Sequence, residues 1–300
     1  MNDVNIWLED PLTPEGASAF SQKMFSLLVD SEAQRRLLES TTEVRELARL
    51  RCVAREGAGD WLGALPSKTL GLHLRRNEFV LAGKYRLGMR VFVTEGECPA
   101  LGCRGVADGL GDHSLSCAIG GERIARHNHA RDVLFQAAVQ AGLAPVREAP
   151  GLLPGAGQRP TDVFLPAWAN GKGACLDFTC TNPLQTATVA RCAEEGAYAV
   201  EKAHNGKLAA YADRVEAEGL VCLPLAVDTF GGWHPEALVV ITKLARQLAR
   251  NVGRETGEQV RHLRQRLGVT LVKDNMAMLQ ARIPTFAPPE VDGDVDREGD

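Results

Sequence analysis

The segments RPTDV at residues 159–163 and LDFT at residues 176–179 decide the expected fold, because each sets an aspartate in a short apolar run typical of a strand. Asp162 and Asp177 are fifteen residues apart, and the chain between them contains the proline, asparagine and glycine residues of a turn. Two adjacent strands joined in this way bring both carboxylates side by side at a sheet edge. Close carboxylates repel unless a cation or a proton lies between them, and Mg²⁺ binds through one or two carboxylates plus substrate phosphates. The pair therefore predicts a metal-dependent phosphodiesterase.

The alternation of side chains along a strand predicts where Asp177 points. Cys175 and Asp177 share one face of the expected strand. Leu176 and Phe178 occupy the other face, and these large apolar side chains require a core. Asp177 is therefore expected to point away from that core, toward the side that Asp162 also faces. For Asp162 alone, the alternative is a strand-end aspartate that caps a turn.

The order of the expected elements predicts an α/β fold. A helix is followed by three strands, a long helical region, a fourth strand and a basic amphipathic helix. Three consecutive strands with short links pair antiparallel, whereas the fourth returns after a long helix and can pair parallel. The expected architecture is thus a mixed four-stranded sheet flanked by helices, in the order αβββαβ. The ranges are Glu122–Ala141, Leu143–Arg147, Thr161–Leu165, Ala174–Cys180, residues 185–218, Leu220–Val227 and Pro235–Asn251.

A second feature is a cluster of metal-ligand residues upstream of the sheet. Cys98, Cys103, His113 and Cys117 supply three thiolates and one imidazole within twenty residues, which matches a tetrahedral structural zinc site. Glycines between them permit the tight turns that wrapping one ion requires. A segment this small has almost no core, so the metal would supply its folding energy. The alternative is four unrelated residues in a glycine-rich loop.

A lysine is the remaining group that metal-aided phosphodiester cleavage would use. The cation polarises the phosphate and activates water, and a lysine can offset the charge that develops. Lys207 and Tyr211 are four residues apart and share a helix face. Lys202 lies about 140° around that helix from Lys207, so the two lysines are not expected to serve one site. Glu148, at the end of the first strand, is the candidate for a third carboxylate. The alternative for Lys207 is a solvated helix face.

Together these residues resemble the restriction-like endonuclease domain of the PD-(D/E)xK superfamily, found at the C-terminus of site-specific non-LTR retrotransposon polyproteins. In that family a Cys-Cys-His-Cys zinc knuckle precedes the nuclease core. The resemblance covers roughly residues 60–280, although Thr161 separates Pro160 from Asp162 and no lysine follows two residues after Asp177. The matching positions are Cys98, Cys103, His113 and Cys117 for the knuckle, Arg126-His127-Asn128 for a helix start, Glu148, Asp162 and Asp177 for the acids, and Lys207 and Tyr211 for the displaced lysine and its tyrosine.

The resemblance implies a Mg²⁺-dependent DNA endonuclease that nicks one strand per active site. Asp162, Asp177 and Glu148 would hold the metal, and Lys207 would assist at the phosphate. DNA is the implied partner, with RNA possible as part of a retroelement complex. One alternative is a catalytically inactive, domesticated nucleic-acid-binding protein of the same fold, and another is a protein-interaction scaffold. The expected divisions are a helical N-terminal and linker region (1–93), the knuckle (94–120), the nuclease-like domain (121–282) and a disordered acidic tail (283–300).

Charge and hydropathy exclude several classes of protein. The chain has 34 basic and 38 acidic residues, and six of the acids lie after residue 289, so the body is near neutral. Nucleic-acid contacts must then come from local clusters. No run approaches 18 apolar residues and no secretory signal is evident, so a nuclear or cytoplasmic protein without a membrane span is expected. The first expected basic cluster is Arg123, Arg126, His127, His129 and Arg131, and Asn128 beside them is also expected to bind nucleic acid. The second runs from Lys243 to Arg266, where a solvated amphipathic face is the alternative.

Overall fold

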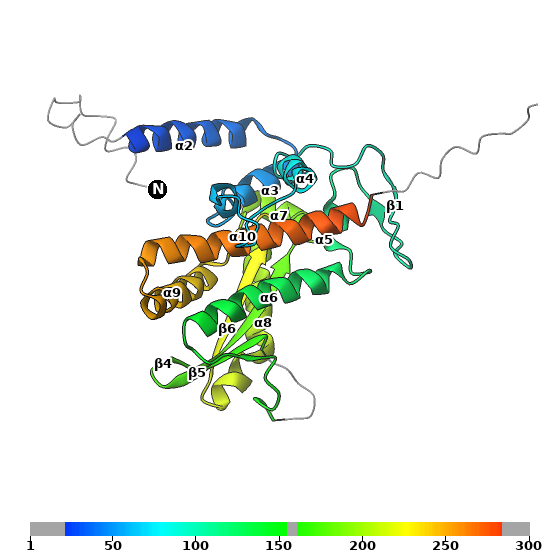
Figure 1. Cartoon of the computed structure of the whole chain (residues 1–300). Coiled ribbons are helices and arrows are strands. Elements are labelled where there is room, and N and C mark those ends of the chain that lie inside the picture. The colour runs from blue at the N-terminus through cyan, green and yellow to red at the C-terminus, as the bar shows by residue number, and fades with distance from the viewer. Residues whose placement is uncertain (1–21, 155–160, 284–300) are drawn as a thin grey trace, which may run out of the picture. The chain divides into compact units, whose positions relative to one another are not determined.

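The computed structural model describes residues 22–154 and 161–283, which form two compact units divided after Glu43. The first unit contributes one described helix, α2 (Gln22–Ser40). The second unit begins at Val44, and it holds the linker, knuckle and sheet regions together (Figure 1). The expected acidic tail after residue 283 and the first two residues of the RPTDV segment lie outside the described residues.

The second unit contains the predicted four-stranded mixed sheet. Its order is β3-β4-β5-β6, with two antiparallel pairings followed by one parallel pairing between β5 and β6. This topology confirms the prediction from the lengths of the connections. The strands are β3 (Val146–Arg147), β4 (Val163–Ala169), β5 (Lys172–Thr181) and β6 (Val221–Asp228).

Local backbone conformation sets the lengths of these strands. Asn170 and Gly171 both have positive φ, 52° and 75°, and they link Ala169 to its partner Lys172 in a two-residue hairpin. Positive φ at both central residues suits the right-handed twist of the flanking strands. Ala144 and Glu148 each have φ of 46°, which is incompatible with extended pairing. They limit β3 to two residues instead of the five that were expected.

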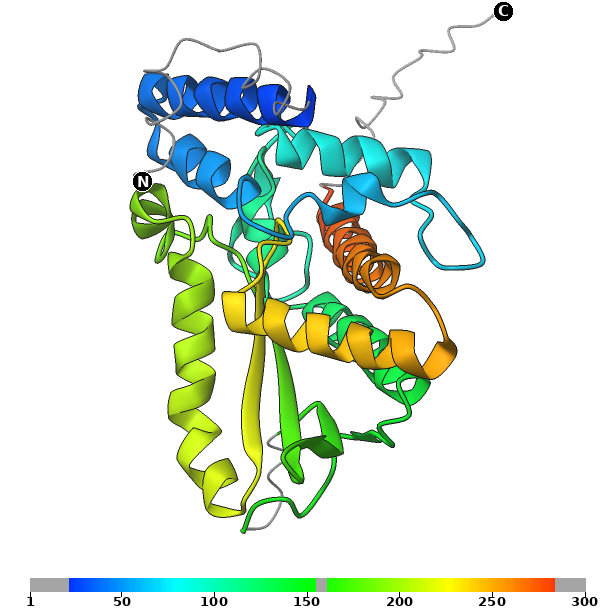
Figure 2. The ribbon, with the colours of Figure 1, turned by 90° about the vertical axis from the view of Figure 1, so that its left-hand side faces the viewer.

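The two faces of the sheet bury different helices. Leu176 and Phe178 of β5 belong to a core cluster with α6 (Glu122–Gln140) and α9 (Pro235–Val252). Cys175, on the opposite face, packs with Val215 of α8 (Tyr198–Ala217). Figure 2 shows α8 running beside β6, with α9 crossing the sheet. The alternation predicted for β5 is therefore confirmed.

The helix α10 (Thr256–Gln280) connects two hydrophobic clusters. Leu263, Leu267 and Leu271 enter the cluster that covers the sheet, whereas Met276 and Leu279 enter a second cluster. The second cluster is built with α3 (Val44–Val53), the 3₁₀ turn η2 (Asp60–Gly63), α4 (Arg76–Arg86) and α7 (Val189–Glu194).

No helix in the described ranges is long and apolar enough to cross a bilayer.

Candidate functional site

The four predicted metal ligands converge on one point. Cys98, Cys103, His113 and Cys117 each bring a ligand atom to within 4.8 Å of the others. The Sγ atoms of Cys98 and Cys117 are 3.9 Å apart, and Cys103 Sγ lies 3.7 Å from Cys117 Sγ and 3.4 Å from His113 Nε2. Zn–S bonds of about 2.3 Å place tetrahedral sulfurs about 3.8 Å apart, so the spacing fits a tetrahedral ion.

A glycine makes room for the histidine ligand. A Cβ atom at Gly105 would lie 2.1 Å from Cε1 of the His113 ring, so only glycine allows the ring to sit there. Cys98 and Cys103 lie between the strands β1 (Gly96–Glu97) and β2 (Val106–Ala107), His113 lies in the helix α5 (Asp112–Ser116), and Cys117 directly follows that helix. These elements are too short to form a core of their own. Such short elements are typical of a segment whose folding depends on a bound metal ion.

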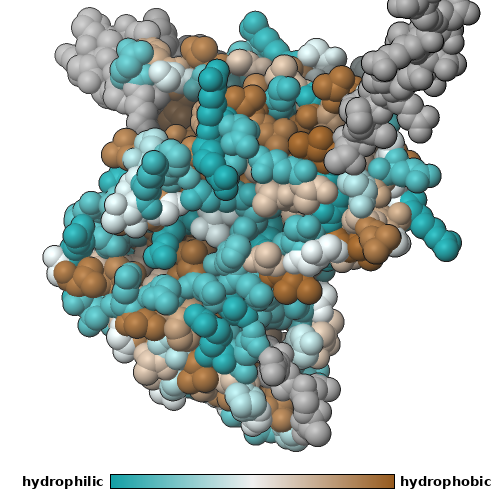
Figure 3. All heavy atoms as spheres, turned by 45° about the vertical axis from the view of Figure 1, so that its right-hand side comes forward, coloured by the Kyte–Doolittle hydropathy of each residue, from teal (hydrophilic) through white to brown (hydrophobic). Residues whose placement is uncertain are grey.

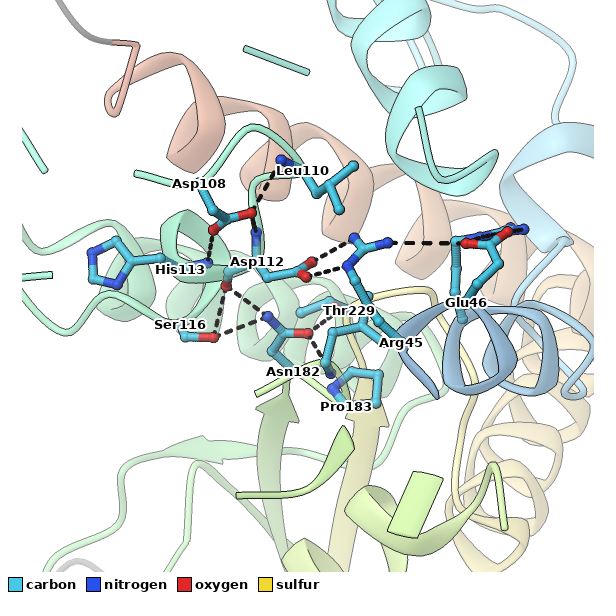
Figure 4. A network of polar contacts seen from close by, with 12 residues as sticks. Arg45, Glu46, Asp108, Leu110, Asp112, His113, Ser116, Asn182, Pro183 and Thr229 are labelled. Carbon is cyan, nitrogen blue, oxygen red and sulfur yellow. Dashed lines mark hydrogen bonds and ion pairs between the residues drawn. The ribbon is translucent and has the colours of Figure 1, made fainter. Parts of the chain in front are cut away.

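A polar network fixes the ligand-bearing helix to its surroundings (Figure 4). The Asp108 carboxylate accepts three backbone N–H groups at the start of α5, including that of His113 at 2.7 Å. The Asp112 side chain accepts two hydrogen bonds from Arg45 of α3, at 2.5 and 2.8 Å. Asn182, just after β5, donates to the Asp112 carbonyl at 2.9 Å. The metal-ligand segment is thus attached to both the helical region and the sheet.

Arg282 is a neighbour of this cluster that sequence reasoning missed. Its buried guanidinium forms an ion pair with Glu122 and donates to the Ile119 carbonyl. Burial acts to raise the pKa of the Cys117 thiol, but hydrogen bonding to the Ile119 backbone and to Arg282 outweighs it, and the net shift is downward. Arg282 follows Cys117 by 165 positions, so no local spacing could have linked them.

The two predicted aspartates meet at the junction of β4 and β5. Asp162 precedes β4, and its backbone N–H donates to the Leu176 carbonyl at 2.9 Å. Its carboxylate Oδ2 accepts the backbone N–H of Phe178 at 2.7 Å. Asp162 thus binds the backbone of Leu176 and of Phe178, the two residues on either side of Asp177. The second carboxylate therefore lies beside the first, and the Asp162 charge adds to the rise in the Asp177 pKa.

Lys207 of α8 binds Asp177 directly. Its Nζ lies 2.8 Å from Asp177 Oδ2 and 3.0 Å from Oδ1. Burial raises the pKa of Asp177 to about 6, and the Lys207 ammonium opposes this rise. Burial also acts to lower the pKa of Lys207, but the Asp177 carboxylate outweighs it and the net shift is upward. The lysine chosen from helix spacing is thus the one that reaches the acid, whereas Lys202 is exposed.

Other predicted site residues take different positions. Glu148 donates its N–H to the Asp162 carbonyl at 3.0 Å, but its carboxylate pairs with Arg131. Within the described chain, Glu148 does not join Asp162 and Asp177 in a cluster with oxygens inside 4.8 Å. Tyr211 packs beside the cluster around Cys175. The expected third carboxylate is therefore bound to an arginine.

Five of the predicted nucleic-acid residues on α6 divide into two that solvent can reach, two buried arginines and one histidine that contacts Asp162. Arg123 is exposed and Asn128 is half-buried. Arg126 is buried and donates to Asn275 Oδ1 of α10 at 2.8 Å, so it braces two helices and is closed to solvent. Buried Arg131 pairs with Glu148. His127 Nε2 lies 2.8 Å from Asp162 Oδ1, which makes it part of the carboxylate site.

Basic side chains are exposed on α9. Lys243, Arg246 and Arg250 all lie on its exposed side. Lys243 also stacks over the Trp168 ring, with 4.3 Å between Nζ and the ring centroid. Hydrophilic side chains cover much of the face drawn in Figure 3, with apolar ones between them.

Comparison of the chain with protein-family models, with curated proteins and with solved structures found no match.

Proposed function

We propose that the chain is a divalent-metal-dependent DNA endonuclease of the restriction-like, PD-(D/E)xK type, with a structural zinc knuckle at Cys98, Cys103, His113 and Cys117. The motif resemblance to non-LTR retrotransposon endonucleases suggests this activity. The observation that carries the proposal is the side-by-side placement of Asp162 and Asp177, with Lys207 bound to the second acid. This combination of two carboxylates and one ammonium group suits hydrolysis of a phosphodiester.

The donor set fits a hard divalent cation such as Mg²⁺. Asp162 and Asp177 would provide two oxygen ligands, and substrate phosphate and water would complete the coordination. Burial raises the pKa of Asp177 to about 6 although Lys207 opposes the rise, and a cation bound between the two aspartates would favour the ionised form of both. When bound, the cation would polarise the phosphate and lower the pKa of the attacking water.

The protein's own groups would then position and stabilise the reacting phosphate. His127 holds the Asp162 carboxylate from α6 at 2.8 Å, so its orientation is set before substrate arrives. Lys207 offers an ammonium group that can offset negative charge developing on the phosphate. Exposed Arg123 and the exposed basic side chains of α9 supply sequence-independent attraction for the DNA backbone.

A plasmid-nicking assay on the full chain tests this proposal. The wild type should convert supercoiled DNA to open circles only with Mg²⁺, and Asp177→Asn should lower the rate about 100-fold or more. Because burial already disfavours the charge at this position, the neutral isostere should leave the fold intact. DNA binding in a mobility-shift assay should be retained.

The matched control is Asp213→Asn, which changes an exposed acid on α8. It should nick DNA at the wild-type rate. If Asp177→Asn nicks as fast as this control, Asp177 does not hold the catalytic metal.

A catalytically inactive DNA-binding protein of the same fold is the second candidate. It is favoured by the contacts that both carboxylates already make, since Lys207 binds Asp177 and His127 binds Asp162. Such a protein needs no cation to satisfy its acids. Titration with Mg²⁺ and with Mn²⁺ separates the two candidates, because the binder shifts DNA in a gel at every metal concentration without producing open circles.

A further inference from the structure

A pocket lies between α10 and the segment 64–75, which leads into α4. Its volume is about 370 Å³, within the range of sites that bind small molecules. The Lys273 ammonium of α10 donates to the Gly71 carbonyl at 2.9 Å, so it holds the segment beside the helix (Figure 2). The charged and titratable side chains that line the pocket are Lys68, His73, Arg75, Glu78, Lys273 and Asp274.

The basic groups around this pocket favour an anion. Within the described chain, the side chains of Lys68 and His73 form no hydrogen bond or ion pair. Glu78 is already engaged, because it pairs with Arg75 Nε at 3.0 Å and accepts the Arg75 backbone N–H at 2.6 Å. The terminal N–H groups of Arg75 remain for a second anion, and the Lys273 ammonium keeps two further donors. Ammonium and guanidinium groups are the side chains that proteins use to bind phosphate.

Asp274 places an acceptor on the α10 side of the same pocket. Its side chain is 12% exposed, and its Oδ1 lies 2.7 Å from His129 Nδ1 of α6. The other oxygen, Oδ2, is buried and has no hydrogen-bond partner among the described residues. Burial raises the pKa of Asp274, although the contact with His129 opposes the rise. A buried oxygen without a partner is costly, so a ligand that brings a donor to it gains affinity.

The pocket is separate from the paired aspartates of the proposed nuclease site. His127 and His129 are two residues apart on α6, which is about 200° around the helix. His127 contacts Asp162, whereas His129 contacts Asp274. The two sites therefore lie on opposite sides of α6, and each can be tested without the other.

We propose that this pocket binds a phosphate ester that also carries a hydroxyl group, such as a ribonucleotide. Lys68, Arg75 and Lys273 would hold the phosphate. A ribose hydroxyl would donate to Asp274 Oδ2, in a charge-assisted hydrogen bond that is roughly twice as strong as a neutral one. The same chemistry is found on a free ribonucleotide and at the 5′ end of an RNA strand. The site goes beyond the proposed nuclease activity, which uses none of these residues.

Isothermal titration calorimetry with adenosine 5′-monophosphate (AMP) tests this site. The wild type should bind AMP at least about 10-fold more tightly than inorganic phosphate or adenosine, because only AMP can reach both the basic groups and Asp274. Lys68→Ala should weaken AMP binding at least about 10-fold. Asp274→Asn keeps the shape of the side chain and removes its charge, so it should weaken AMP binding at least about 10-fold without weakening the binding of inorganic phosphate.

Lys202→Ala is the matched control, because Lys202 is an exposed lysine of α8. It should bind AMP with wild-type affinity, and circular dichroism verifies that every variant folds. The proposal is overturned if the wild type does not bind AMP, or if Lys68→Ala and Asp274→Asn bind it as tightly as the control. The titration contains neither Mg²⁺ nor DNA, so its failure would leave the nuclease proposal unchanged.

Competition with RNA distinguishes the two sources of the ligand. A 5′-phosphorylated RNA oligonucleotide that displaces AMP, where its unphosphorylated form does not, identifies the end of an RNA strand as the ligand. AMP binding that neither oligonucleotide displaces identifies the free ribonucleotide.

Discussion

Asp228 illustrates how a single buried carboxylate couples folding to pH. It is fully buried, and it accepts hydrogen bonds from Arg55 at 2.9 Å and from the N–H groups of Phe230 and Gly232. Burial raises its pKa from 3.8 to about 6 in spite of these partners. Between these two values the folded protein binds more protons than the unfolded chain. The contribution of Asp228 to stability is therefore complete below about pH 4 and is lost as the pH rises through 6.

Asp228→Asn should remove this part of the pH dependence. Two pKa units correspond to about 3 kcal/mol, so the free energy of unfolding of the wild type should fall by up to that amount, relative to the variant, between pH 4 and pH 7. Urea titrations at a series of pH values measure the difference. Asp177, whose pKa is also raised to about 6, keeps its own contribution in both proteins. Parallel curves for the wild type and the variant would show that Asp228 is already ionised at pH 4.

Gly105 should be essential for the metal binding proposed at the cysteine-rich cluster. In Gly105→Ala the new methyl group would lie 2.1 Å from the His113 ring, so the imidazole must leave its position. Loss of one of four ligands should cause the variant to lose the ion to a mild chelator far faster than the wild type. The control is Gly96→Ala in the same segment, where a Cβ meets nothing within 4 Å. Equal metal retention by both variants would exclude His113 as a ligand.

Some individual contacts follow from sequence periodicity and others do not. The period of two along β5 correctly sets Asp177 opposite Leu176 and Phe178, because one face of a strand must be buried. The contact between His127 and Asp162 depends on how α6 crosses the sheet, which no local pattern encodes. The pairing of Arg131 with Glu148 also depends on the position of α6. It explains why the Glu148 carboxylate, which was expected beside Asp162 and Asp177, binds an arginine instead.

The helix α5 depends on one acid for its start. Asp108 accepts the N–H groups of Leu110, Asp112 and His113, which the short helix cannot satisfy by itself. Asp108→Ala should destabilise the protein by about 1–2 kcal/mol and loosen metal binding, since one of these groups belongs to a ligand. Chemical unfolding and metal-release rates measure both effects. Glu97→Ala, at an exposed position of β1, should change neither. A variant at Asp108 with wild-type metal release would show that the ligands alone hold α5.

Long elements were predictable and very short ones were not. The helix α6, the hairpin at Asn170 and Gly171, and the antiparallel and parallel pairings follow from periodicity, turn chemistry and connection length. The strands β1 and β2 have two residues each and no apolar pattern. Two of the cysteine ligands lie between these strands, and Ala107 of β2 packs in the second hydrophobic cluster, so their existence depends on tertiary contacts. β3 is also only two residues long, and its length likewise could not be predicted from local sequence.

The division after Glu43 gives a prediction for the chain as a whole. Because residues 44–283 contain the three hydrophobic clusters, the sheet and the cysteine-rich cluster, a chain that begins at Val44 should fold without the first unit. Its thermal unfolding midpoint and metal content should match those of the full chain. Circular dichroism and metal analysis provide the comparison. A shortened chain that precipitates or melts many degrees lower would show that the first unit stabilises the second.

The position of α10 has a consequence for how the second unit comes apart. This single helix supplies leucines to the cluster over the sheet and methionines to the cluster of the helical region, and just beyond its end Arg282 supports Cys117. Unfolding of the whole helix would expose apolar surface in both clusters at once. The sheet, the helical region and the cysteine-rich segment should therefore lose amide protection together, as one cooperative block.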